Sequence, residues 1–432
     1  MRKWCWTAGI AVLVGCDPHA DVKTLYKGPA GTATGEATAT GDYDGDGRFD
    51  VLVAASKAHR GYVIEAAALT AGVAAIHDVG FVIDGSDLAP GLGYSAADAT
   101  DSNGDGIHDL VLGARPEDEE TAIIGAVLLG PIRGDRTVHA GDTLLTAPGD
   151  LGYRAAVFAA GDLDNDGADD IAVGLPTGDV VALIHGPLAP GPHPVDTSAH
   201  RLVGPESSGS GSEAIVAGDV DGDGIKDLIV GSPWADDTCG AAHIVYGPVQ
   251  GEVDLLDQPT VTGDGCHGAE IGATLSPAGD RNADGYADIA VGAPAQPLSD
   301  DGYTGAVAIV SGPVRGDVVF HDAETVAYGT PGSRFGQAIA SIGDDNRDSF
   351  DDLAIGAPDA NDGAGHVVFL PGGIVGQFDA RDLPVLGAIA MPGDQLGQAL
   401  TTVPTADGPT LIVGAPGLYS GGGGALVVEP GW

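Results

Sequence analysis

Basic residues are scarce in this chain of 432 residues. Its 18 lysines and arginines stand against 62 aspartates and glutamates, which gives a formal net charge of -44 at pH 7. So large a negative charge repels phosphate backbones, and it argues against nucleic acid as a partner. High net charge is also typical of disordered chains, but 43% of the residues are hydrophobic, which is enough for a core. We therefore expect a globular protein whose acidic charge is partly neutralised.

Signals for helices and for common catalytic sites are missing as well. No segment shows helical periodicity, and there is no Gly-x-Ser-x-Gly elbow, no phosphate-binding loop and no Cys-His pair at plausible spacing. The 12 histidines show no metal-binding spacing, and His243 and His366 lie in predicted strands, where packing is the expected role. The sequence therefore favours an all-β protein without enzymatic activity.

What the sequence has instead is one acidic loop that occurs six times. Each loop carries Asp or Asn at positions 1, 3, 5 and 9, and successive loops begin 57 to 64 residues apart. This spacing lets a turning backbone aim four side-chain oxygens inward, while the carbonyl at position 7 completes the shell. Ca²⁺ accepts about six to eight oxygen ligands in irregular geometry, so the pattern predicts six calcium sites and a repeat architecture.

We number these loops 1 to 6 in chain order. Acidic solvated turns are the alternative interpretation, but turn chemistry does not explain an Asp that returns at position 9 every time. Loop 6 is the weakest, because Ser349 replaces the usual Gly and a left-handed backbone there costs about 1 kcal/mol. The predicted ligands are Asp42, Asp44, Asp46 and Asp50 with the carbonyl of Arg48; Asp101, Asn103, Asp105 and Asp109 with Ile107; Asp162, Asp164, Asp166 and Asp170 with Ala168; Asp219, Asp221, Asp223 and Asp227 with Ile225; Asp280, Asn282, Asp284 and Asp288 with Tyr286; and Asp344, Asn346, Asp348 and Asp352 with Phe350.

Each loop lies within a unit of short apolar runs. A pair such as Phe335-Gly336 and a run of small residues precede the loop, and a run such as residues 288–292 follows it. These runs are too short for helices and end in Gly-Ala-Pro or a similar triplet, where proline stops strand pairing. A third run, closed by Gly-Pro, and a looser fourth complete the unit. Four short strands in about 60 residues predict the blades of a β-propeller.

The combination of Phe-Gly, acidic loop and Gly-Ala-Pro resembles the FG-GAP repeats of the integrin alpha-subunit head and its bacterial relatives. The resemblance covers seven units and implies a seven-bladed propeller of four-stranded antiparallel blades. It also implies Ca²⁺ between the first and second strands on one face and partner-binding loops on the opposite face. Two units depart from the pattern: the seventh lacks ligands at residues 405–410, and the first has Ala54-Ala55-Ser56 at the triplet. Residues 24–28 are expected to close the ring as the fourth strand of the last blade.

The N-terminus is similar to a bacterial lipoprotein signal. Residues 1–3 are basic at two positions, residues 4–15 are apolar but too short to span a bilayer, and residues 13–16 read Leu-Val-Gly-Cys. The resemblance implies a signal peptide at residues 1–15, a lipidated Cys16 on a tether at 16–21, and a propeller at 22–432. An ordinary secretory signal with an incidental Cys is the alternative. Cys239 and Cys266 then remain, and in an exported protein we expect them to form a disulfide.

The leading hypothesis is a monomeric, calcium-stabilised propeller, lipid-anchored at a bacterial cell envelope, that binds a protein or glycan ligand. Its interaction loops would be those between second and third strands, where Trp234 is either a ligand anchor or a cover for its own blade. Two Arg-Gly-Asp triplets, at residues 133–135 and 315–317, are interpreted as structural turns. Two rival hypotheses are an enzyme, such as a polysaccharide lyase or hydrolase, with a site in the central channel, and a structural subunit of an envelope complex.

Overall fold

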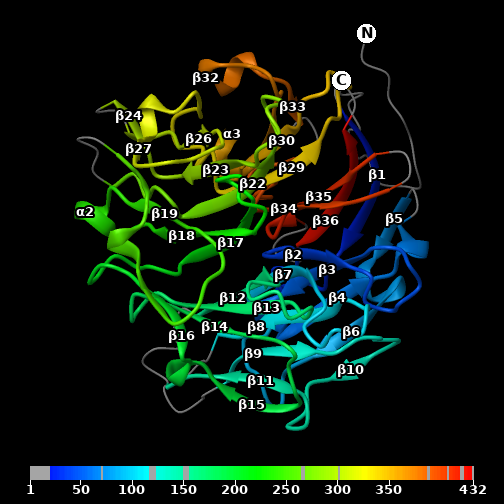
Figure 1. Ribbon diagram of the computed structural model, residues 1–432. Coiled ribbons are helices and arrows are strands. Elements are labelled where there is room, and N and C mark those ends of the chain that lie inside the picture. The colour runs from blue at the N-terminus through cyan, green and yellow to red at the C-terminus, as the bar shows by residue number, and fades with distance from the viewer. Residues whose placement is uncertain are drawn as a thin grey trace.

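The computed structural model describes residues 20–432 except 70–71, 116–122, 149–154, 264–267, 300–301, 387–389, 406–407, 419–422 and 431–432. Within this part, seven β-sheets are arranged around a central axis (Figure 1). The innermost strand of each sheet lies beside the innermost strands of both neighbours, so the ring is closed. The predicted all-β, seven-bladed propeller is therefore confirmed.

Each blade contains four antiparallel strands, ordered from the axis outward. They are β2 (Thr38–Gly41), β3 (Asp50–Ala55), β4 (Arg60–Ile64) and β6 (Gly80–Asp84) in blade 1; β7 (Ser95–Thr100), β8 (Asp109–Gly113), β9 (Ile123–Leu128) and β11 (Thr143–Thr146) in blade 2; β12 (Ala156–Gly161), β13 (Asp170–Leu175), β14 (Val180–Ile184) and β16 (His200–Val203) in blade 3; β17 (Glu213–Gly218), β18 (Asp227–Ser232), β19 (Ala241–Val245) and β21 (Thr260–Thr262) in blade 4; β22 (Thr274–Gly279), β23 (Asp288–Ala293), β26 (Ala306–Val310) and β28 (Thr325–Tyr328) in blade 5; β29 (Ala338–Gly343), β30 (Asp352–Ala357), β31 (His366–Leu370) and β33 (Val385–Leu386) in blade 6; and β34 (Ala399–Val403), β35 (Thr410–Gly414), β36 (Gly424–Pro430) and β1 (Ala20–Lys27) in blade 7.

Helical segments in the described residues are single turns. Two are α2 (Ala235–Thr238) and α3 (Ala360–Gly363), and the 3-10 turns are Ser56–Ala58, Ala66–Ala68, Ile76–Asp78, Val195–Thr197, Leu255–Asp257, Phe320–Asp322 and Ala380–Asp382. A small hairpin pairs β24 (Pro297–Ser299) with β25 (Gly302–Tyr303). None of the helices in this part of the chain is long and apolar enough to span a membrane.

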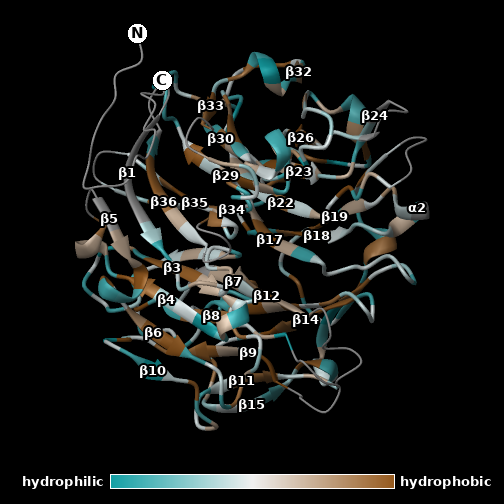
Figure 2. Ribbon diagram, turned by 180° about the vertical axis from the view of Figure 1, so that it is seen from behind, coloured by the Kyte–Doolittle hydropathy of each residue, from teal (hydrophilic) through white to brown (hydrophobic). Residues whose placement is uncertain are grey.

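The second and third strands form the core because each is covered by a neighbouring blade on both faces. Every residue of β13, β18, β23 and β30 is buried, which explains why their sequences are continuous apolar runs without alternation. Figure 2 shows the hydrophobic colour concentrated on these strands. His243 and His366 are buried in third strands, as expected, and burial lowers the pKa of His243 to about 4.

The glycines of the repeat lie where adjacent blades touch. Gly336 has a positive φ of 88°, and its N–H donates to the carbonyl of Gly356 in its own blade. Gly356 in turn faces the next blade, where a Cβ on it would lie only 2.0 Å from the carbonyl oxygen of Gly397. Side chains would separate the blades at both positions, so the glycines of Phe-Gly and Gly-Ala-Pro allow close inter-blade contact.

Six blades carry a fifth strand that the sequence did not predict. A short segment from the following blade pairs in parallel with the outer fourth strand, and in blade 7 this segment comes from blade 1. The segments are only two to four residues long and lack an apolar pattern, which explains why they were missed. They are β5 (Gly72–Ala75), β10 (Arg136–Thr137), β15 (Gly191–Pro194), β20 (Glu252–Asp254), β27 (Val318–Val319) and β32 (Gly376–Asp379).

The N-terminal strand closes the ring, as predicted. β1 pairs antiparallel with β36 from Ala20 opposite Pro430 to Lys27 opposite Gly424, so it extends further toward the N-terminus than residues 24–28. Figure 1 shows the two strands side by side. Tyr26 is 1% exposed and donates its hydroxyl hydrogen to the carbonyl of Ala68 in blade 1, at 2.7 Å. This contact joins the last blade to the first.

Candidate cation-binding loops and the central channel

The six acidic loops connect the first strand of a blade to the second, so all of them lie at one end of the ring. They join β2 to β3, β7 to β8, β12 to β13, β17 to β18, β22 to β23 and β29 to β30. The corresponding connection in blade 7 runs from β34 to β35, and residues 406–407 of it lie outside the described residues.

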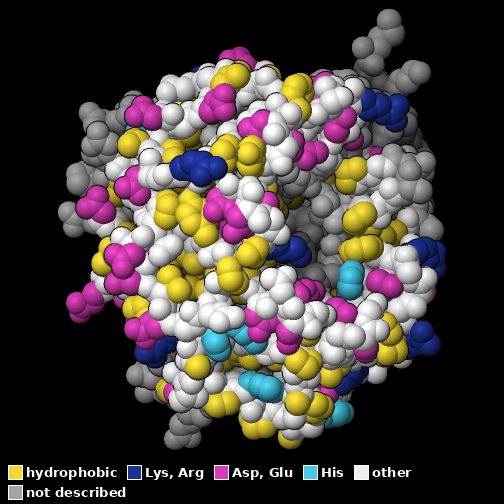
Figure 3. Space-filling model, viewed as in Figure 1, with side chains coloured by type: hydrophobic (Ala, Val, Ile, Leu, Met, Phe, Trp, Pro, Cys, Tyr) yellow, Lys and Arg dark blue, Asp and Glu magenta, His cyan; other side chains and the backbone are white. Residues whose placement is uncertain are grey.

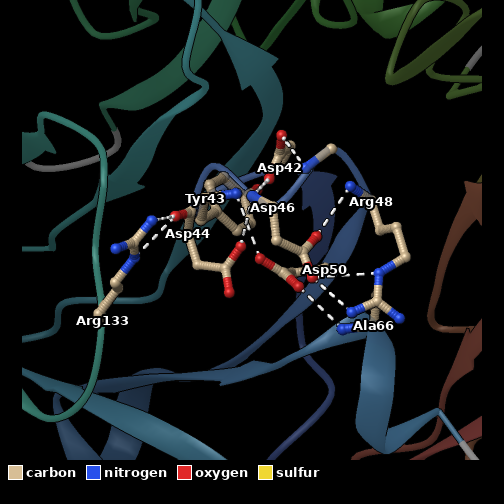
Figure 4. Close-up of polar contacts among 9 residues, drawn as sticks. Asp42, Tyr43, Asp44, Asp46, Arg48, Asp50, Ala66 and Arg133 are labelled. Atoms are coloured by element: carbon tan, nitrogen blue, oxygen red, sulfur yellow. Dashed lines mark hydrogen bonds and ion pairs between the residues drawn. The ribbon is translucent and has the colours of Figure 1, made fainter.

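All six loops share one hydrogen-bond scaffold. The N–H of position 5 donates to side-chain oxygens of positions 1 and 3, at 2.8 to 3.2 Å. The N–H of position 6 donates to position 1, and that of position 7 donates to position 5. The backbone thus turns around its own acidic side chains, as Figure 4 shows for loop 1.

The aspartate at position 9 ties each loop to its blade. One carboxylate oxygen accepts the N–H of position 2, and the other accepts the N–H of a residue just beyond the third strand. These six aspartates are at most 1% exposed. Burial raises the pKa of all six, and that of Asp50 and Asp288 rises to about 6.

Two positions in each loop have a left-handed backbone. Position 6 was expected to need one, and its φ lies between +84° and +95° where it is Gly. Ser349 takes the same conformation in loop 6, with φ of +77°, so the predicted strain is present. A left-handed backbone at position 4 was not predicted, although φ of this residue lies between +57° and +84° in all six loops. Its residues include Ala283 and Arg347, so its identity gave no consistent signal.

The scaffold brings predicted ligands together. Carboxylates of Asp42, Asp44 and Asp50 have oxygens within 4.8 Å of one another, as do the groups Asp162, Asp164, Asp166 and Asp219, Asp221, Asp227. Loops 2, 5 and 6 have Asn at position 3, whose side-chain oxygen accepts the same bond from position 5. Asp46 differs, because it pairs with Arg48 at 2.5 Å, and this hydrogen bond lowers the pKa of Asp46. The role of the position 7 carbonyls stays a prediction.

A central cavity of about 1470 Å³ runs along the axis inside the first strands (Figure 3). Its wall carries mostly small and apolar side chains, and its charged residues lie toward the two ends. At the end opposite the acidic loops it is lined by Lys57, Tyr94, Arg115, Trp234 and Glu270. Of these five residues the sequence singled out only Trp234, because the others come from several units and share no motif.

Trp234 and Glu213 line this channel in contrasting surroundings. Trp234 lies against the backbone of Gly209, where an added Cβ would be 2.4 Å from the indole ring. The indole therefore packs on its own blade and also lines the cavity, while its role as a ligand anchor stays a prediction. Glu213, at the start of β17, has no hydrogen-bond or ion partner among the described residues, and burial raises its pKa to about 8.

Comparisons with known proteins match parts of this chain to a described repeat. A family model described as FG-GAP repeat matches residues 34–64, 212–256 and 272–310, which belong to blades 1, 4 and 5. The chain carries FG-GAP repeats. It is 30% identical over 227 residues to integrin alpha pat-2 of Caenorhabditis elegans, 31% over 178 residues to integrin alpha-5 of Xenopus laevis, and 30% over 219 residues to integrin alpha-V of Gallus gallus. These matches cover 47%, 40% and 48% of this chain, but only 18%, 16% and 20% of the integrin chains.

Solved structures support the fold alone. BBS1N, solved in complex with ARL6DN, superposes with a TM-score of 0.50 at 11% identity and covers 94% of this chain and 93% of its own. A streptogramin B lyase also has a TM-score of 0.50, at 10% identity, and covers 96% of this chain and 99% of its own.

Hydrogen bonds connect neighbouring FG-GAP loops around the ring. The N–H of Asp42 donates to His108 of loop 2, that of Asp101 to Asp169 of loop 3, and that of Asp280 to Asp351 of loop 6. The buried Arg281 of loop 5 also reaches blade 6. Its guanidinium donates to the carbonyls of Asp351, Leu370 and Pro371. These hydrogen bonds therefore join one loop directly to the next.

The two Arg-Gly-Asp triplets make structural contacts, in agreement with their interpretation as turns. Asp135 accepts the N–H of Val82, and Asp317 accepts the N–H of Thr260, each on the outer strand of the preceding blade. Arg133 donates two hydrogen bonds to the carbonyl of Asp44 in loop 1. The triplets thus fix the crossing segments that provide two of the fifth strands, β10 and β27.

Some predicted residues lie partly or wholly outside the described part of the chain. Cys239 is disulfide-bonded, but Cys266 lies in residues 264–267, so this pairing stays a prediction. The backbone places the two segments together, because the N–H of Ile271 donates to the carbonyl of Cys239. Cys16 and the predicted signal also lie outside the described residues.

The raised pKa values predict how the metal-free protein responds to pH. Asp50 and Asp288 have a pKa of about 6 when folded and 3.8 as the ordinary value, so between these values the folded state holds more protons. Their contribution to stability is present below pH 3.8 and is lost as the pH rises through 6. In excess chelator, we expect the Tm of the wild type to fall between pH 5 and 7 by more than that of Asp288→Asn. Equal falls in the two proteins, measured by circular dichroism, would contradict this cause.

Proposed function

We propose that this protein is a calcium-binding FG-GAP propeller that acts as a binding module. The observation that carries the calcium proposal is the recurrence of the same folded scaffold in all six loops. Each loop gathers hard oxygen donors, three of them on a solvent-facing turn and one buried, which is the donor set that Ca²⁺ prefers. The residues are those predicted from the sequence, at positions 1, 3, 5 and 9, with the carbonyl at position 7.

Calcium would act chiefly on stability. Positions 1, 3, 5 and 9 of the loops hold 21 carboxylates at one end of the ring, and these repel one another when no cation is bound. The buried carboxylate at position 9 gains most, because a cation nearby offsets the cost of keeping it charged away from water. Bound Ca²⁺ would therefore keep the loops, and the blades they join, in the folded arrangement.

Removal of calcium tests this proposal. A site filled at about 100 times its Kd adds about 2.7 kcal/mol to the free energy of unfolding, so chelator should lower the Tm by many degrees. Asp221→Ala should lower the Tm in excess Ca²⁺, while Asp257→Ala, at an exposed position outside the loops, should not. Differential scanning calorimetry measures both effects. A Tm that is the same in Ca²⁺ and in excess EDTA would refute the proposal.

The binding role would belong to the face opposite the loops. Tyr94, Arg115 and Trp234 line the channel there, and Arg115 lies 5.2 Å above the ring of Tyr94. Aromatic and arginine side chains of this kind anchor protein and glycan ligands. The ligand class in this proposal is a protein or a glycan. A second candidate is an enzyme in the channel, which is favoured by the unpartnered Glu213, because a carboxyl group that is protonated at neutral pH can act as a general acid.

One screen separates these two candidates. The Ca²⁺-loaded protein is incubated with arrayed glycans and envelope proteins, and both bound ligand and released products are measured. A binding module should retain ligand without turnover, and Trp234→Ala should weaken retention, whereas Glu213→Gln should not. An enzyme should release product, and Glu213→Gln should abolish that release. Product formation that depends on Glu213 would overturn the binding-module proposal.

We assign the protein to a bacterial cell envelope with Cys16 as a lipid anchor, on the strength of the Leu-Val-Gly-Cys sequence. In the native host, the wild type should sediment with membranes after a high-salt wash, and Cys16→Ser should be released into the soluble fraction. Cys5→Ser provides a matched control, since it removes a cysteine that lies within the predicted signal peptide. A Cys16→Ser variant that still sediments with membranes would contradict the anchor.

A further inference from the structure

Loop 3 differs from the other loops because an imidazole lies at its edge. His185 follows β14 and precedes Gly186, whose N–H donates to the position 9 carboxylate of Asp170 at 2.9 Å. The Nδ1 atom of His185 is 3.1 Å from a carboxylate oxygen of Asp164. Asp164, Asp170 and His185 each offer one ligand atom, and these atoms lie within 4.8 Å of one another. A nitrogen donor is therefore within reach of an ion held by this loop.

The five other blades that carry an acidic loop serve as an internal comparison. The equivalent position in each is identified by the next residue, whose N–H donates to the position 9 aspartate. None of the five side chains contains a nitrogen, and the loops beside them have the same scaffold. The imidazole is thus specific to loop 3 and is not needed to shape it. The five residues are Glu65, Leu129, Tyr246, Ser311 and Pro371.

The ring of His185 is held in place by its surroundings. It stacks on His200 with ring centroids 4.3 Å apart and an angle of 25° between the planes. His200 is itself fixed, because its Nδ1 accepts the N–H of Gly251 from the next blade. The His185 side chain is 13% exposed, and its Nε2 is buried without a hydrogen-bond partner in the described part of the chain. Stacking therefore orients the ring, and its Nδ1 faces the loop.

We propose that loop 3 is a mixed nitrogen and oxygen site, formed by Asp164, Asp170 and His185, that selects a transition-metal ion of the Zn²⁺ and Co²⁺ class. Imidazole suits these ions, whereas Ca²⁺ takes oxygen ligands almost exclusively. Two carboxylates and one imidazole also match the three protein ligands of an open zinc site. The inference rests on the proposed function of the loops as cation sites, and it specifies which cation one of them prefers.

The test uses the full chain, freed of metal by chelator and then saturated with Ca²⁺. Co²⁺ is titrated into this protein, and its visible absorption and the bound metal are measured. We expect one Co²⁺ to remain bound after gel filtration in excess Ca²⁺, and His185→Leu to lose it. Leucine is a suitable replacement because Leu129 occupies the same position in blade 2. His193→Ala is the matched control, since it removes a half-buried histidine of β15, outside loop 3, and should keep the Co²⁺.

Two results would overturn the inference. One is the displacement of all Co²⁺ from the wild type by excess Ca²⁺, and the other is binding of Co²⁺ to His185→Leu with the same spectrum and stoichiometry. In either case His185 only donates a hydrogen bond to Asp164. Should His185→Leu fail to fold, His185→Tyr replaces it, because Tyr246 fills this position in blade 4. Failure of the proposed function gives a different result, in which no loop of the wild type binds Ca²⁺ at all.

Discussion

The structure depends on six buried aspartates, one at the ninth position of each acidic loop. Each carboxylate accepts one hydrogen bond from the loop and one from the chain just beyond the third strand, so it joins the inner and middle parts of its blade. Desolvation opposes the charge of these groups and raises their pKa values. The hydrogen bonds of each loop favour a charged carboxylate, whereas burial opposes the charge. A cation bound by the same loop, as proposed above, would offset this cost.

This arrangement explains how so acidic a chain forms a compact ring. The repeat places 21 of the 62 acidic side chains at the ligand positions at one end of the molecule, and of these only the position 9 aspartates lie within the second strands. Adjacent loops are also hydrogen-bonded to one another, through side chains such as His108 and Asp351. These hydrogen bonds connect the geometry of one loop to that of the next around parts of the ring.

The propeller separates its two ends by chemistry. Acidic loops lie at one end, whereas the channel at the other end is lined by Tyr94, Arg115 and Trp234. Between them the channel wall is built from the seven first strands, mostly by small and apolar side chains. The acidic loops and the channel residues therefore lie at separate ends, so a change in the side chains at one end does not directly alter the other.

The sequence by itself determined the repeat, the number of blades, the short strands and the position of the acidic loops. These features could be predicted because each depends on local chemistry, such as the oxygen spacing of a loop or the apolar run of a buried strand. The closing strand at residues 24–28 could also be predicted, since its sequence resembles residues 325–329 of another unit. Its extension to Ala20 could not, because that part depends on pairing with the distant β36.

Tertiary structure alone decided features that join residues far apart in the chain. The fifth strands carry almost no pattern, and they exist because a crossing segment reaches the edge of the preceding blade. The contact between His185 and loop 3 likewise depends on where β14 ends, as the histidine lies 21 residues beyond Asp164 in sequence. The channel lining combines single residues from several blades. The strand pairing within blade 3 brings His185 to loop 3, whereas the packing of blades around the ring creates the fifth strands and the channel lining.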